Sequence, residues 1–137
     1  MLKRVILAIV AAFVAFTVLS MLMHGVILSK SYGTPVFRPE TEMSIGLALA
    51  VNLVVVWAFV LVYARYVQPK SVLAGLGMGT LWGIASGVSM GMGSFSAMAI
   101  EFNIALTWCL GTLVQFVAVG LIAGLIVKQP AAEAAAA

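Results

Sequence analysis

Four long apolar stretches alternate with short polar segments along the chain. The runs 5–29, 43–64, 71–100 and 102–127 contain no charged side chain, and charges gather in the segments between them. Each run is longer than the roughly 18 apolar residues that mark a membrane-crossing helix. The pattern therefore predicts an all-α, polytopic membrane protein whose four transmembrane helices form an antiparallel bundle. The predicted spans are about 5–28, 43–66, 71–100 and 103–127.

The connecting segments predict how the chain is organised. Thr41 is placed to cap the second helix, because its hydroxyl can accept a hydrogen bond from a free amide of the first turn. The connection at 67–70 is short, so we expect helices two and three to be antiparallel neighbours. Residues 1–130 are expected to form a single transmembrane domain. The alanine-rich tail, 131–137, is assigned no function.

Basic residues predict the orientation of the helices. Lys and Arg are enriched near the cytoplasmic ends of membrane spans. With a cytoplasmic N-terminus, the inner side would hold Lys3, Arg4, Arg65, Lys70 and Lys128, and the outer side Lys30 and Arg38. This imbalance favours an arrangement with both termini inside.

Composition agrees with the membrane class. Of 137 residues, 64% are hydrophobic and 8% are charged, whereas soluble domains carry about 25% charged residues. The net charge of +3 suits a protein whose basic residues lie beside anionic lipid head groups. No basic cluster suited to nucleic acid is present, so we expect membrane lipid as a partner and no nucleic acid.

Glycine recurs at every fourth position of the third span. In membranes, small residues four apart form a flat stripe along which another helix can approach closely. The stripe covers about 24 Å at 1.5 Å per residue, and a shorter pair of glycines follows in the fourth span. The expected helix-packing residues are Gly75, Gly79, Gly83, Gly87, Gly91, Gly120 and Gly124. Whether the partner helix belongs to this chain, a second copy or another protein stays open.

Two groups of polar residues are candidates for chemistry. Asn52 and Gln115 lie near the middle of their spans, where an amide pair would serve as structural glue more readily than as a substrate contact. A second group is expected near the outer ends of the helices, as a polar cluster that binds a ligand or a proton or pins the loop: His24, Tyr32, Arg38, Glu42, Glu101 and Asn103. His24 is the only histidine, and Cys109 is the only cysteine, which excludes an internal disulfide. We expect no metal site and no cofactor.

Several short motifs resemble a family. The chain carries His24-Gly25, then LSKSY at 28–32 and FRPETEM at 37–43, with a glycine-rich third span. These features resemble small uncharacterised bacterial four-helix membrane proteins, whose first hairpin carries a His-Gly, a Tyr, an aromatic-Arg-Pro and a Glu-Met. The resemblance implies the bacterial inner membrane as location and brings no activity with it. It marks His24, Tyr32, Arg38, Pro39, Glu42 and Trp108. The family pattern has Glu where Gln115 stands, so a proton-carrying role is not expected there.

Three function classes remain, and the first is favoured. It is a non-catalytic integral membrane protein, an accessory or oligomer-forming subunit of a larger complex that packs through the glycine stripe. The alternative is a small transporter or channel with an outward-facing polar site around His24 and Glu101. Charged residues inside spans usually mark transport paths, and here they are absent. An enzyme is least expected, because no reactive constellation is visible.

Overall fold

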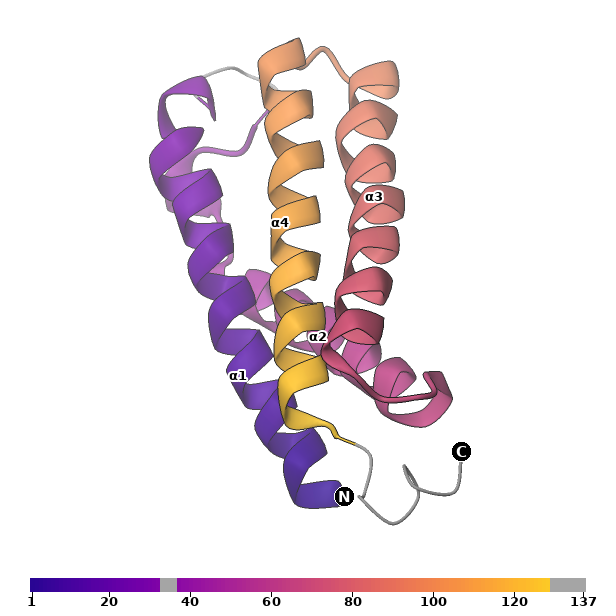
Figure 1. Ribbon diagram of the computed structural model, residues 1–137. Coiled ribbons are helices and arrows are strands. Elements are labelled where there is room, and N and C mark those ends of the chain that lie inside the picture. The colour runs from indigo at the N-terminus through magenta and orange to yellow at the C-terminus, as the bar shows by residue number, and fades with distance from the viewer. Residues whose placement is uncertain (33–36, 129–137) are drawn as a thin grey trace.

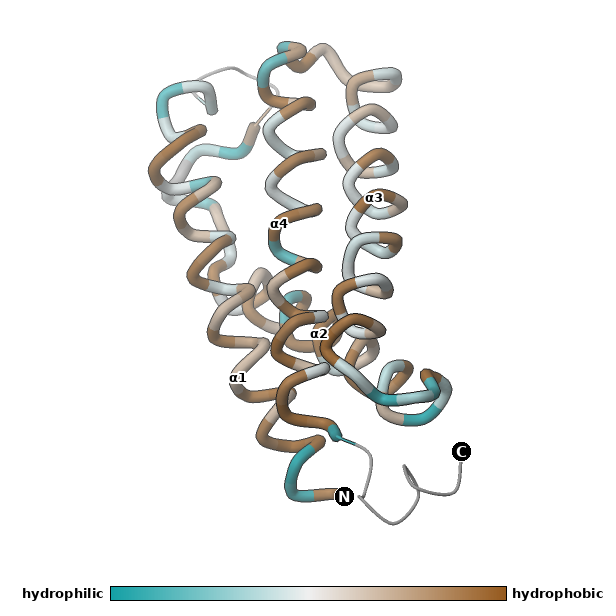
Figure 2. Tube along the Cα trace, viewed as in Figure 1, coloured by the Kyte–Doolittle hydropathy of each residue, from teal (hydrophilic) through white to brown (hydrophobic). Residues whose placement is uncertain are grey.

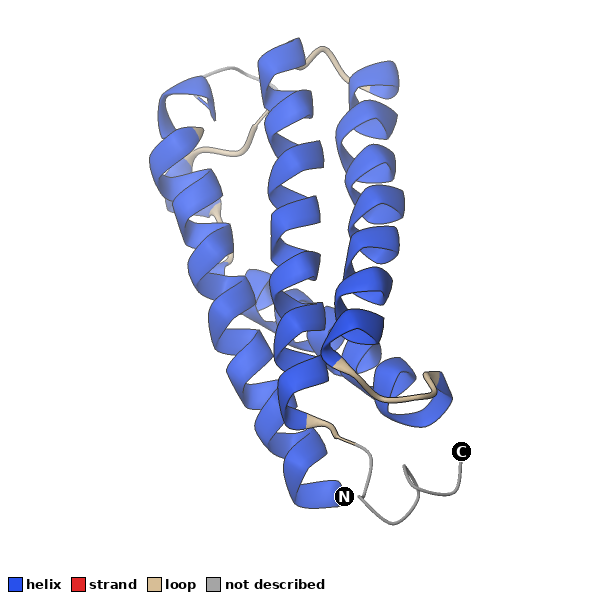
Figure 3. Ribbon diagram, viewed as in Figure 1, coloured by secondary structure: helices blue, strands red, loops and turns tan. Residues whose placement is uncertain are grey.

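The computed structural model describes residues 1–32 and 37–128, and this part of the chain is helical without a strand (Figure 3). The elements in chain order are α1 (Leu2–Met21), the π-helical η1 (Leu22–Ile27), the short 3-10 helices η2 (Ser29–Tyr32) and η3 (Glu40–Glu42), α2 (Ile45–Tyr66), α3 (Val72–Ala97) and α4 (Phe102–Ile126). The tail 131–137 lies outside the described residues.

Four helices are long and apolar enough to cross a membrane: α1 continued by η1, then α2, α3 and α4. Figure 2 shows apolar residues along all four, with hydrophilic ones concentrated near their ends. The described part of the chain is thus all-α, and its four candidate spans suggest a multi-pass membrane protein, as the sequence predicts.

Serine side chains cap the N-termini of two helices, α2 and α3. The Ser44 hydroxyl accepts from the amide of Leu47 at 3.3 Å, and the Ser71 hydroxyl accepts from the amide of Ala74 at 3.0 Å. These are N-caps, which satisfy amides that a helix start leaves free. The expectation that Thr41 caps α2 is wrong, because Thr41 lies within η3 and α2 begins after Ser44.

The helices do not pack as equal neighbours. In Figure 1, α1, α4 and α3 run side by side, and α2 crosses behind them at a slant. The closest pair is α3 with α4, followed by α1 with α4 and α1 with α2. Helix α2 reaches α3 near their short connection, where the Tyr63 hydroxyl donates to the carbonyl of Ser71 at 2.8 Å. The short connection therefore does not make α2 the main neighbour of α3.

The glycine stripe explains the α3–α4 pairing. Gly75, Gly79, Gly83, Gly87 and Gly91 are all buried. At four of them, a Cβ atom would collide with a backbone carbonyl oxygen of α4, namely those of Gly120, Phe116, Cys109 and Ala105. The glycine α-hydrogen that takes the place of Cβ therefore points at a carbonyl oxygen, as in a Cα–H···O contact worth about 0.5–1 kcal/mol. The helix that lies in the stripe is α4 of the same chain.

Helix α4 also contributes glycines to the contact with α3. A Cβ on Gly120 would meet the carbonyl oxygen of Gly75, and one on Gly124 would lie 2.8 Å from the carbonyl oxygen of Ser71. The two backbones therefore approach closely from both sides. Since α4 occupies the stripe, that surface is not available to a further helix.

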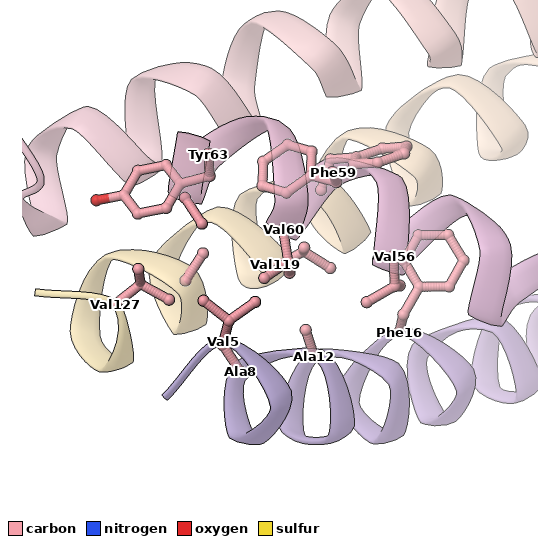
Figure 4. Packing of buried hydrophobic residues seen from close by; sticks show 13 residues of the cluster. Val5, Ala8, Ala12, Phe16, Val56, Phe59, Val60, Tyr63, Val119 and Val127 are labelled. Atoms are coloured by element: carbon pink, nitrogen blue, oxygen red, sulfur yellow. The ribbon is translucent and has the colours of Figure 1, made fainter. Parts of the chain in front are cut away.

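Two apolar cores lie at opposite ends of the bundle. The first joins α1, α2 and α4 near the N-terminus (Figure 4): Val5, Ala8, Ala12, Phe16, Val56, Phe59, Val60, Tyr63, Ala64, Phe116, Val119, Ala123 and Val127. The second joins η1 to the start of α4: Met23, Leu28, Ile100, Ile104, Ala105 and Trp108. The buried residues of α2 begin only at Val56, so its first half contributes no buried residue to either core.

Neighbouring glycines of α3 provide a matched test of the packing. We expect Gly79→Ala to destabilise the protein by about 1–3 kcal/mol, because the added methyl group overpacks the contact with Phe116. Gly77→Ala meets open space and should leave stability unchanged or raise it by up to about 1 kcal/mol, the gain in helix propensity. Unfolding by sodium dodecyl sulfate, followed by circular dichroism, measures both. Equal stability of the two variants would contradict the assigned packing.

Candidate functional site: a polar cleft between the helices

A cleft of about 440 Å³ lies among the four helices, and each of them contributes to its wall. Apolar side chains such as Phe16, Trp82 and Phe116 line part of it. The rest is polar, with side chains from Ser20, His24, Asn52, Ser86, Ser89, Thr112 and Gln115. A concave site with an apolar wall and a few convergent polar groups is the usual form of a small-molecule site.

The position of the cleft follows from the slant of α2. Helix α2 fills the space beside α1 and α4 only from Val56 onward. Toward the other end, α1, α3 and α4 lack a tightly packed fourth helix until the second core closes the bundle around Trp108. The cleft therefore lies between the two apolar cores, along the middle of the helices.

Gln115 is the most deeply buried polar group of the cleft, with 3% of its surface exposed. Its amide nitrogen donates to the carbonyl of Phe16 at 3.4 Å, which is longer than the usual 2.7–3.2 Å. A carboxamide can form up to four hydrogen bonds, and this is the one found for Gln115 in the described part of the chain. Because the nitrogen faces Phe16, the oxygen Oε1 faces the other way.

The oxygen of Gln115 is accessible. Among the described residues, Thr17 Oγ1 is the one buried side-chain nitrogen or oxygen atom without a hydrogen-bond partner. Gln115 Oε1 has no hydrogen-bond partner in the described part of the chain either, so this atom is not fully buried, and Gln115 lines the cleft. An unused acceptor on a buried amide costs about 1–3 kcal/mol if nothing satisfies it.

The expected amide pair is not formed as a direct contact. Asn52 and Gln115 both line the cleft, but Gln115 bonds Phe16 instead, and no hydrogen bond joins the two amides in the described residues. Their common location makes them two separate polar groups of one cavity.

A chain of hydrogen bonds closes the end of the cleft near His24. The indole Nε1–H of Trp108 donates to the hydroxyl of Tyr32 at 2.9 Å, and that hydroxyl is bonded to Nδ1 of His24. The rings also lie close: the planes of His24 and Tyr32 are nearly parallel with their centroids 5.8 Å apart, and the centroids of Phe37 and Tyr32 are 4.7 Å apart. We call His24, Tyr32 and Trp108 the hydrogen-bonded triad.

Local backbone structure brings the triad together. Helix α1 continues as the π-helix η1, in which the amide of Leu28 bonds the carbonyl of Met23, five residues earlier. The wider turn lets both Met23 and Leu28 point into the second core. His24 is thereby placed against η2, which carries Tyr32. Single π turns in α-helices are frequent at functional sites.

Tyr32 stays protonated near neutral pH. Burial raises the pKa of its phenol, and the hydrogen bond from Trp108 opposes this rise without cancelling it. Because the pKa lies above the ordinary value of about 10, the hydroxyl retains its hydrogen and can donate it.

The structure divides the cluster expected from the sequence. His24 and Tyr32 are joined, and Trp108 completes their group. Arg38, Glu42, Glu101 and Asn103 are exposed, and Asn103 turns its side-chain oxygen to the amide of Ile104. No ion pair joins Arg38 to either glutamate within residues 1–32 and 37–128. Exposed charges gain little from pairing in water, and these four residues lie outside the cleft.

Sequence reasoning missed the hydroxyl residues of the cleft. Ser20, Ser86 and Ser89 carry no distinctive signal, because serine in a span often bonds its own helix backbone. A usable sign is spacing: Phe16, Ser20 and His24 follow at four-residue intervals along α1 and η1, as do Trp82 and Ser86 on α3. Such intervals place residues on one helix face.

The mouth of the cleft lies along the side of the bundle. Lining residues that are also exposed come from the interiors of α2 and α3: Val51 is 52% exposed, Met90 44% and Trp82 38%. The cleft therefore opens between α2 and α3, the two helices that barely contact each other.

No family model, curated protein or solved structure matches this chain.

Proposed function

We propose that the chain is a non-catalytic membrane protein that holds a small, uncharged amphiphile in the cleft, as a binding protein or as a small transporter. The proposal depends on one observation: the buried Gln115 lines a cavity at the middle of the helices, and its Oε1 has no hydrogen-bond partner among the described residues. A buried acceptor of this kind favours a molecule that brings a hydrogen-bond donor to it.

The charge of the cleft defines the class of molecule. Among the described residues, its lining contains no carboxylate, lysine or arginine, and His24 is its one ionisable group. An ion would lose its hydration without a countercharge, which is costly. A neutral molecule with polar groups and an apolar body fits both the amides and the aromatic wall formed by Phe16, Trp82 and Phe116.

The position of the mouth favours entry from the bilayer. Val51, Trp82 and Met90 lie within spans, so a mouth bordered by them would face hydrocarbon rather than water. Substrate sites of many transporters lie near the bilayer midplane. A lipid-soluble molecule could reach this cleft without crossing an aqueous vestibule.

Orientation and location complete the proposal. We assign both termini to the cytoplasm of a bacterial inner membrane, on the distribution of basic residues. A reporter active only in the cytoplasm should work when fused after Lys128 and fail when fused after Glu42. The reverse pattern would overturn this orientation and place the triad at the cytoplasmic face.

Removal of the Gln115 amide tests the cleft directly. Wild-type protein purified in lipid nanodiscs should retain a neutral amphiphile, detected by mass spectrometry after extraction. Gln115→Leu keeps a similar volume but offers no acceptor, and we expect about fivefold less of that molecule, the effect of losing about 1 kcal/mol of hydrogen bonding.

Thr107→Val is the matched control on the same helix. The Thr107 hydroxyl bonds the carbonyl of Asn103 at 2.8 Å and does not line the cleft, so retention should match that of the wild type. Equal extracts from wild type and Gln115→Leu would refute the proposed function. An accessory-subunit role would then be supported if a second protein copurified in stoichiometric amount.

A further inference from the structure

We infer that His24 presents a fixed hydrogen-bond donor, its Nε2–H, to the cleft, so that the bound molecule carries a carbonyl oxygen at that end. This inference rests on the proposed function and adds the chemical class of the molecule. It follows from the order of donors and acceptors in the hydrogen-bonded triad.

Trp108 sets which groups donate and which accept in the hydrogen bonds of the triad. An indole Nε1–H can donate and cannot accept, so in the 2.9 Å contact with Tyr32 the phenol oxygen is the acceptor. The hydroxyl hydrogen of Tyr32 is then free to point elsewhere. Its other polar neighbour in the described structure is Nδ1 of His24.

The tautomer of His24 follows from that neighbour. If Tyr32 donates to Nδ1, this nitrogen is the acceptor, and the single ring hydrogen of a neutral imidazole must be on Nε2. In the opposite tautomer, Tyr32 would accept from both Trp108 and His24, and its own hydrogen would have no acceptor among the described residues. A polar hydrogen without a partner in a half-buried place is unfavourable.

The Nε2 atom of His24 retains some exposure. His24 is partly buried, and no hydrogen bond to Nε2 occurs in the described part of the chain. This atom is nevertheless not among the fully buried atoms without a partner. Since His24 lines the cleft, Nε2–H is offered to a molecule inside it.

Two polar groups of opposite kind therefore face the cavity at different depths. The donor of His24 lies near Trp108, and the acceptor of Gln115 lies seven residues further along α4, a rise of about 10 Å. The matching molecule is a neutral amphiphile with a carbonyl group for His24 and a hydroxyl or amide N–H for Gln115. A pure hydrocarbon matches neither group.

The single histidine allows the tautomer to be measured without a binding assay. In protein labelled with ¹⁵N-histidine in nanodiscs at neutral pH, the two ring nitrogens report which of them carries hydrogen. We expect a protonated Nε2 and a bare Nδ1. Tyr32→Phe should give a mixture of tautomers, and the exposed Tyr66→Phe should leave the wild-type spectrum. A wild-type spectrum with hydrogen on Nδ1 overturns the inference, whatever the cleft binds.

A pair of probes tests the carbonyl. Methyl nonyl ketone and undecane have similar length, but only the ketone can accept from Nε2–H. We expect the ketone to shift the Nε2 resonance and undecane to leave it in place. Retention of ketone after repurification, measured by mass spectrometry, should fall about fivefold in His24→Phe, as for the loss of one hydrogen bond.

The outcomes separate the two proposals. Retained ketone with an unshifted Nε2 resonance would overturn the role of His24 and leave the proposed function standing. Failure to retain ketone, together with equal extracts from wild type and Gln115→Leu, would remove both. A shift caused equally by ketone and undecane would also overturn the inference, because it would reflect apolar packing alone.

Discussion

The close backbone contact between α3 and α4 is the constraint on which the rest of the structure depends. Glycines at four-residue intervals on α3 let the carbonyl oxygens of α4 approach where side chains would otherwise stand. In lipid, where apolar burial contributes little to helix association, such packing is a main source of cohesion. Because α3 is committed to α4 along its length, α2 is left to pack on α1 and α4, and it crosses them at a slant.

The slanted path of α2 leaves the space that forms the cleft. Its apolar contacts are confined to the half of the bundle that contains the N-terminus, and the second core closes the opposite end. Between them the helices leave a cavity whose wall combines apolar side chains with hydroxyl, amide and imidazole groups. The hydrogen-bonded triad then fixes the end of that cavity, since Tyr32 is bonded to the Nδ1 edge of His24 and Trp108 donates to Tyr32.

Much of the fold is readable from sequence, because long charge-free runs permit little other than spanning helices. The spacing of glycines indicates a close-packing face, but it carries no information on which helix lies against it. The path of α2 is not readable, since it depends on the space that the other helices leave. For the site, His24 and Gln115 stand out because polar groups in apolar runs need partners, and Tyr32 lies in the polar segment that follows the first run. The grouping of His24 and Tyr32 with Trp108 depends on a contact between residues that are 76 positions apart in sequence. Exposed charges such as Arg38 are solvated by water and need no partner.

The most direct test of the central claim is the polarity of the cavity compared with the lipid-facing surface at the same depth. In a Cys109→Ala background, Ser86→Cys places a thiol in the cleft, and Val88→Cys places one on the exposed face of the same helix. Thiols react with maleimide as thiolates, which an apolar environment disfavours. We predict that N-ethylmaleimide labels Ser86→Cys at least about tenfold faster than Val88→Cys in nanodiscs, corresponding to about 1.4 kcal/mol. Equal rates at the two positions would contradict a polar cleft between the helices.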